Sequence, residues 1–286
     1  NASIRVPYLG FAPAGLSDSV SDGAEKYNGL QATLRKSFSH GLTMQAAYTY
    51  SRAFTTVITS NGTQITVNDP DITGWAPNGL YRPQRLTVNY SYDLPLGKHE
   101  GFLDKVASGW TVSGVTVVQD GTPLTITDSR GGTIYGFGGA ATQVSTAVYA
   151  AGMSAVNAAS TGSVQQRLGG ANGGQGWFNK AAFTTAAFPV SPFASDGKAT
   201  GWGDVGPGIV LGPGQFNWDM ILAKTTRVGG LREDATLQFR TEFFNTFNHP
   251  QFNNPSVADV SKSTFGQITS TSVNPRLIQM ALKYSF

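Results

Sequence analysis

The chain has 286 residues, and charged side chains make up only 13% of them, with a net charge of +3. Soluble proteins carry about 25% charged residues, so this composition disfavours an ordinary cytosolic enzyme. The Lys and Arg residues are scattered, which gives no support to a nucleic-acid partner, and the absence of Cys excludes disulfides and thiolate metal sites.

The first predicted elements are a loop and a pair of strands. Residues 1–26 are punctuated by Gly and Pro, which predicts an irregular segment. Apolar and polar residues then alternate over Asn28–Phe38 and over Leu42–Ser51, the period of a strand with one apolar face. A tight turn at 39–41 joins these two strands into a hairpin. A strand of about ten residues has the length that crosses a bilayer at a tilt.

The next two predicted strands cover Arg85–Leu94 and Trp110–Gln119, the second continuing as far as Thr127. Between them, Pro95–Ser108 forms a short connection. The first four strands therefore fall within residues 27–127.

The longest irregular stretch is 128–214, rich in Gly, Ala, Ser and Thr, with one short helix predicted around Thr146–Ala159. A loop of this length counts against a compact soluble domain, whereas membrane barrels place long loops on their outer side. Three last strands are predicted within residues 215–286. They cover Gln215–Arg227, Ala235–Asn245 and Arg276–Phe286.

The connections between these seven strands alternate strictly in length. Those after the first, third and fifth strands are short, and those after the second, fourth and sixth are long. This alternation is typical of a transmembrane β-barrel with periplasmic turns and extracellular loops. A soluble antiparallel sheet with one buried face gives the same period within each strand, but it has no reason to sort its loops. Because bacterial barrels have an even number of strands, at least eight, we expect this all-β, antiparallel segment not to close alone.

The last strand carries a second indication of an outer-membrane protein. Its apolar residues alternate up to an aromatic carboxy-terminal residue: Ile278, Met280, Leu282, Tyr284 and Phe286. This pattern resembles the final strand of outer-membrane barrels, in which it is the assembly signal. The resemblance implies recognition by the barrel-assembly machinery.

Five segments resemble, in the correct order, the C-terminal barrel of TonB-dependent outer-membrane receptors, particularly the Oar-like group. They are YNGLQATLRKSFSHGLTMQAAYTYS (Tyr27–Ser51), YRPQRLTVNYSYDLP (Tyr81–Pro95), GWFNKAAF (Gly176–Phe183), GPGQFNWDMILAKTTRV (Gly212–Val228) and FRTEFFNTFNHPQFNNP (Phe239–Pro255). The resemblance implies a barrel of twenty-two strands around an N-terminal plug, which imports large ligands with energy passed on by TonB.

The chain contains neither a plug nor a TonB box, and it starts at Asn1 without a leader, so we expect a piece of a longer protein. The resemblance implies a receptor or transporter of the bacterial outer membrane that has no catalytic role and no cofactor. Its expected partners are outer-membrane lipid, the TonB complex through the missing plug, the assembly machinery and an unknown large ligand. A structural or adhesive barrel that presents long surface loops is the alternative, and a soluble carbohydrate-binding β-sandwich is a third hypothesis.

Two groups of residues are candidates for function. Aromatic rings and planar guanidinium groups in the long loops suit sugars or large flat ligands, although the same rings would also suit packing of the loops over the barrel mouth. The predicted ligand-binding residues are Trp75, Tyr81, Arg82, Tyr135, Trp177, Phe178 and Trp202. The second group is a predicted polar network on the lumen face, which would stiffen the wall or contact the plug. It comprises Asp219, Gln238, Arg240, Glu242 and Lys283. The three His residues show no metal-binding spacing, so no metal site is predicted.

Overall fold

The computed structural model describes residues 24–56, 59–60, 63–66, 75–96, 102–128, 144–169, 175–184, 205–229 and 232–286. No helix within these ranges is both long enough and apolar enough to cross a membrane.

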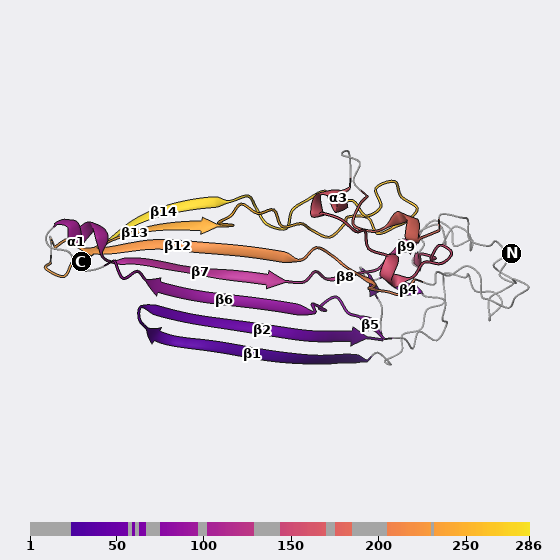
Figure 1. The fold of residues 1–286 in the computed structure, drawn as a ribbon, viewed down its shortest axis with the longest axis horizontal. Coiled ribbons are helices and arrows are strands. Elements are labelled where there is room, and N and C mark those ends of the chain that lie inside the picture. The colour runs from indigo at the N-terminus through magenta and orange to yellow at the C-terminus, as the bar shows by residue number, and fades with distance from the viewer. Residues whose placement is uncertain are drawn as a thin grey trace, which may run out of the picture.

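Seven long strands form one antiparallel sheet in which neighbours along the chain are also neighbours in space (Figure 1). Their order is β1-β2-β6-β7-β12-β13-β14, and the short strand β5 (Ala76–Pro77) pairs with the outer part of β2. The strands are β1 (Glu25–Ser39), β2 (Leu42–Thr55), β6 (Gln84–Asp93), β7 (Trp110–Gln119), β12 (Gln215–Arg227), β13 (Thr236–Phe244) and β14 (Leu277–Ser285).

All seven predicted strands are confirmed, and all except Gln215–Arg227 differ from the prediction at an end. The first strand begins earlier than expected, at Glu25, and the second continues to Thr55. The extension of the fourth strand to Thr127 is wrong, because β7 ends at Gln119 and Thr127 belongs to a separate short strand, β9 (Thr127–Asp128). The alternation of short and long connections is also confirmed.

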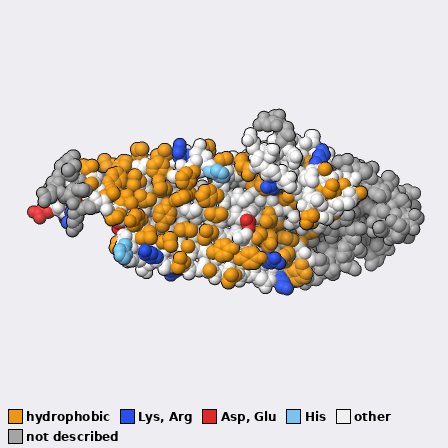
Figure 2. Space-filling model, in the orientation of Figure 1, with side chains coloured by type: hydrophobic (Ala, Val, Ile, Leu, Met, Phe, Trp, Pro, Cys, Tyr) orange, Lys and Arg blue, Asp and Glu red, His pale blue; other side chains and the backbone are white. Residues whose placement is uncertain are grey.

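The register joins the apolar side chains of all seven strands on one side of the sheet, since directly opposed residues share a face. For example, Tyr48 lies opposite Leu86, Leu86 opposite Val118, and Val118 opposite Phe216. We call this side the apolar face, and Figure 2 shows hydrophobic side chains covering much of the molecule over the sheet. It includes Leu30, Leu34, Leu42, Met44, Tyr48, Leu86, Tyr90, Tyr92, Val112, Val118, Phe216, Trp218, Met220, Leu222, Leu237, Phe239, Phe243, Ile278, Met280, Leu282 and Tyr284.

The opposite side of the sheet, the polar face, carries mostly hydroxyl, amide and charged side chains. It includes Gln31, Thr33, Arg35, Gln45, Thr49, Asn89, Ser91, Thr111, Ser113, Asn217, Asp219, Thr225, Gln238, Arg240, Glu242, Gln279 and Lys283. A sheet with one apolar and one polar face is what a barrel wall between lipid and an aqueous lumen requires.

The short connections lie together at one end of the sheet, the turn end, where the C-terminus also lies (Figure 1). His40 and Gly41 connect β1 to β2 with φ values of 52° and 77°, as a two-residue type I′ hairpin requires. The connection at Pro95–Ser108 includes a helix that was not predicted, α1 (Phe102–Ala107).

The long connections lie at the other end, the loop end, and contain short elements (Figure 1). These are β3 (Thr59–Ser60), β4 (Thr63–Thr66), β8 (Pro123–Leu124), β9, β10 (Val144–Thr146), the 3₁₀ turns η2 (Ala155–Asn157) and η3 (Lys180–Ala182), α3 (Val164–Leu168) and β11 (Val210–Leu211). The helix predicted around Thr146–Ala159 is wrong, because that segment contains the end of β10 and the turn η2. The helix of this connection, α3, begins after Ser163, whose hydroxyl accepts a hydrogen bond from the backbone N of Gln166.

Candidate functional site

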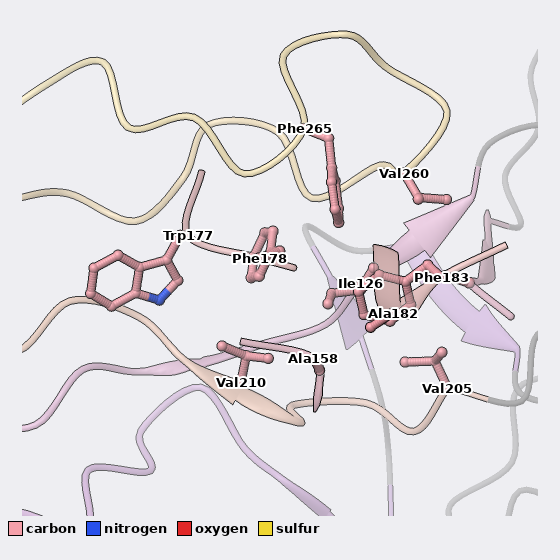
Figure 3. Close-up of a cluster of buried hydrophobic side chains, with 11 residues drawn as sticks. Ile126, Ala158, Trp177, Phe178, Ala182, Phe183, Val205, Val210, Val260 and Phe265 are labelled. Atoms are coloured by element: carbon pink, nitrogen blue, oxygen red, sulfur yellow. The ribbon is translucent and has the colours of Figure 1, made fainter. Parts of the chain in front are cut away.

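The loop end contains a hydrophobic core that is separate from the two faces of the sheet (Figure 3). Phe178 is fully buried, and its ring centroid lies 5.2 Å from that of Phe265. Phe183 meets the same Phe265 ring edge to face at 6.0 Å. Because Phe178 and Phe183 come from the connection between β7 and β12 and Phe265 from that between β13 and β14, the two connections share one core. We call this packed unit the cap.

Backbone hydrogen bonds join the same two connections. The N–H of Thr127 donates to the carbonyl of Ala258 at 2.9 Å, and the N–H of Val260 donates to the carbonyl of Thr127 at 2.9 Å. The N–H of Trp177 donates to the carbonyl of Gly266 at 2.7 Å. The connection between β2 and β6 is attached as well, since β4 pairs in parallel with β10. All three long connections therefore contribute to the cap.

Two of the predicted ligand-binding aromatics belong to the core of the cap. Trp177 is 6% exposed and Phe178 is 0% exposed, so the expectation that their rings are presented at the surface is wrong. The indole N–H of Trp177 donates to the carbonyl of Leu211 at 2.8 Å, which satisfies the one polar atom of a buried ring. Their burial follows from contacts with segments far away in the sequence.

Three other candidates surround the outer end of β2 and β6. Trp75 is 49% exposed. The Tyr81 ring lies 5.8 Å from that of Phe54, and one terminal guanidinium nitrogen of Arg82 donates to the carbonyl of Asp120 at 2.9 Å. Tyr135 and Trp202 lie outside the described residues. Tyr81 and Arg82 are thus held against the sheet by these contacts, whereas Trp75 directly precedes β5.

The five residues of the predicted polar network all lie on the polar face, but they do not form one cluster of contacts. Arg240 Nε lies 2.6 Å from Glu242 Oε1, and Gln238 is directly opposite Lys283. Asp219 has a different role, because its carboxylate accepts hydrogen bonds from the backbone N of Asn245 at 2.8 Å and from Asn217 Nδ2 at 3.1 Å. It thereby stabilises the chain where β13 ends.

A groove of about 510 Å³ lies on the polar face near the turn end. Arg35, Gln45, Asn89 and Ser113 line it, and Val115 and Ile221 contribute apolar surface. No carboxylate of the described residues is among its lining. The groove offers a cation, amides and hydroxyls, which suits a polar or anionic occupant.

A network of side-chain amide hydrogen bonds at the outer end of β12 was missed by the sequence interpretation. Asn245 bonds through its side chain to the backbone N and O of His249 and to the carbonyl of Asn274. Gln251 is 2% exposed and bonds to the backbone of Phe216 and to His249 Nδ1. The available signal was the density of amide side chains in NTFNHPQFNN, residues 245–254.

Four of the five residues of the predicted assembly signal lie on β14, at the edge of the sheet, and the fifth, Phe286, directly follows it. Ile278, Met280, Leu282 and Tyr284 are on the apolar face, with Met280 69% and Leu282 68% exposed. The rings of Tyr284 and Phe286 lie 5.6 Å apart. In the described part of the chain β14 pairs with β13 alone, so its outer backbone edge is open to a further strand.

Within the described ranges, no three His, Asp or Glu side chains lie close enough together to hold a metal ion. The chain matches a family model described as "Outer membrane beta barrel domain" over residues 1–279. No curated protein and no solved structure matches the chain.

Proposed function

Because the chain belongs to the outer membrane β-barrel domain family and is located in the bacterial outer membrane, we propose that it forms the C-terminal part of a TonB-dependent receptor. The protein would bind a large ligand outside the cell and import it. Members of this barrel family are typically not enzymes, and we propose no catalytic role. The five resembling segments support the assignment to this class of receptor.

The two faces of the sheet support a simple arrangement in the membrane. The apolar face would contact lipid, and the polar face, with its groove of about 510 Å³, would line the lumen. The turn end would face the periplasm, and the cap would face the outside. Phe286 would then lie at the periplasmic side, where the assembly machinery binds a last strand.

The observation that carries the proposal is the cap itself. Three connections, which are separate in the sequence, pack into one unit at the end of a wall that has a polar lumen face. A pre-organised surface of this kind lowers the entropy that is lost when a ligand binds. Trp75, Tyr81 and Arg82, which lie at the base of the same loops, are the ligand-binding residues that we propose. Tyr135 and Trp202 remain predictions.

The alternative is a structural or adhesive barrel that presents the cap to other surfaces. It is favoured by the same packed core, since a rigid cap is also a suitable display unit. A display protein does not require a polar groove on the lumen face, so the groove gives this alternative no support.

The experiment that separates these functions uses the full-length protein that contains this chain. We would recover the reading frame upstream of Asn1 and measure binding of the purified periplasmic domain of TonB to outer membranes that contain the protein. A plug, a TonB box and saturable TonB binding that is lost when the box is deleted are expected. An upstream frame without a plug, or membranes that bind no TonB, would overturn the receptor and leave the display protein.

A further inference from the structure

A second cavity, of about 500 Å³, lies at the loop end, where β7 and β12 meet the cap. Val164 and Leu168 of α3 line one part of it, with Trp177 beside them. Val118 and Phe216 line the part formed by the sheet. We call it the rim pocket.

The rim pocket is continuous with the apolar face. Val118 and Phe216 are opposed residues of β7 and β12 on that face, and they are 39% and 41% exposed. Both lie at the outer ends of their strands, where the apolar face meets the cap. With the cap on the outside, as proposed above, this is the level of the outer leaflet, so the pocket would be open to the same lipid as the face below it.

A positively charged side chain, Arg167, lies beside the rim pocket. The guanidinium carbon of Arg167 lies 3.7 Å from the centroid of the Trp177 ring, which itself lines the pocket. Arg167 makes no ion pair with any carboxylate of the described residues, and its buried Nε has no hydrogen-bond partner among them. Burial lowers the pKa of Arg167 from its ordinary value. An arginine side chain nevertheless stays charged, so this cation has no counter-anion among the residues that the structure describes.

We propose that the rim pocket binds one acyl chain of an anionic lipid of the outer membrane, with the lipid headgroup on Arg167. The chain of the lipid would lie between α3 and the apolar residues Val118 and Phe216. The phosphate or carboxylate of the headgroup would complete the hydrogen bonding of the guanidinium group. This inference rests on the membrane location of the protein and not on transport.

Photocrosslinking tests where lipid reaches the protein. These 286 residues contain no Cys, so a Cys introduced here is the single labelling site once any Cys elsewhere in the full-length protein has been replaced by Ser. The full-length protein carrying Val164→Cys, labelled with benzophenone maleimide, would be reconstituted in vesicles of phosphatidylcholine and phosphatidylglycerol. Leu282→Cys, on the exposed apolar face, is the positive control, and Val156→Cys, 88% exposed on the cap, is the negative control. We expect lipid adducts at positions 164 and 282 but not at position 156.

Three outcomes of this experiment would overturn the proposal. Adducts at position 282 without adducts at position 164 would mean that the rim pocket is closed to lipid, while the membrane location stands. Adducts at neither position would mean that the sheet is not embedded, which would contradict the proposed function as well. Adducts at position 164 with oleate supplied in water, but not with vesicle lipid, would assign the pocket to a soluble ligand instead.

The amount and the composition of the lipid that copurifies with the protein test the role of charge at the rim pocket. Val164→Asp places a carboxylate in the pocket at the first turn of α3, a position at which the helix tolerates an acidic residue, so the cap should still fold. We expect it to reduce retained lipid about fivefold, whereas Val156→Asp should leave retention unchanged. Arg167→Gln should lower the ratio of retained phosphatidylglycerol to phosphatidylcholine, and an unchanged ratio would remove the headgroup from the proposal.

Discussion

The side-chain amide of Gln251 pairs with both backbone groups of Phe216. The N–H of Phe216 donates to Gln251 Oε1 at 2.6 Å, and Gln251 Nε2 donates to the carbonyl of Phe216 at 2.6 Å. These bonds reproduce those of a neighbouring strand at a point where β13 has already ended at Phe244. The amide orientation is fixed by the backbone N–H, and His249 Nδ1 accepts the second hydrogen of Nε2 at 2.8 Å.

The first prediction concerns this pairing. Gln251→Ala should lower the free energy of unfolding by about 1–3 kcal/mol, because it leaves the backbone N–H and C=O of Phe216 without their side-chain partners. Urea unfolding of the protein in detergent micelles would measure the change. Gln31→Ala, on the exposed strand β1, should change it by less than about 0.5 kcal/mol. Equal effects of both substitutions would show that the Gln251 side chain does not take the place of the backbone hydrogen bonds of a neighbouring strand.

The second prediction concerns a hydrogen bond on the apolar face. The indole N–H of Trp218 donates to the hydroxyl of Tyr90 at 2.7 Å, and the Tyr90 ring covers Gly114 between the two strands. Tyr90→Phe should destabilise the protein by about 1 kcal/mol, because lipid offers the indole N–H no other partner. Tyr92→Phe removes a hydroxyl at the next position of the same face and is the control. Fluorescence of Trp218 should shift with the first substitution only.

The third prediction compares two glycines in turns. Gly109 and Gly229 have φ values of 77° and 64°, but a Cβ on Gly109 would lie 2.3 Å from the carbonyl oxygen of Thr225, whereas one on Gly229 meets nothing within 4 Å. Gly109→Ala should therefore cost about 2–4 kcal/mol and Gly229→Ala about 1–2 kcal/mol. The midpoint of thermal unfolding on gels would rank them. A smaller loss for Gly109 than for Gly229 would contradict the close contact.

The fourth prediction concerns the core of the cap. Phe178→Ala should cost about 3–5 kcal/mol, because it empties a fully buried position beside Phe265. The loss should be local, so amide hydrogen exchange should increase at Trp177 and Gly266 more than in β12. Trp75→Ala, at a half-exposed position, should leave exchange in the cap unchanged. Faster exchange throughout the sheet would mean that the cap and the wall unfold together.

The strands were predictable because their signal is local. Each strand by itself shows the alternation of apolar and polar residues. For this reason Gln215–Arg227 was predicted with its true bounds. The hairpin at His40 and Gly41 was predictable for the same reason. The error at Thr127 has a physical cause as well, since β9 continues the alternation but pairs with β10 in the cap.

The sequence by itself determined the class of the protein, the seven strands with one apolar face, and the sorting of short and long connections to opposite ends. Only the tertiary structure decided which loop aromatics are exposed, because the Phe178 ring packs against Phe265 and the indole of Trp177 bonds to Leu211, both in distant segments. It also decided that the side chain of Gln251 forms hydrogen bonds with the backbone N–H and C=O of Phe216. Local periodicity carries no information about such contacts, which exist only when the three long connections have packed together.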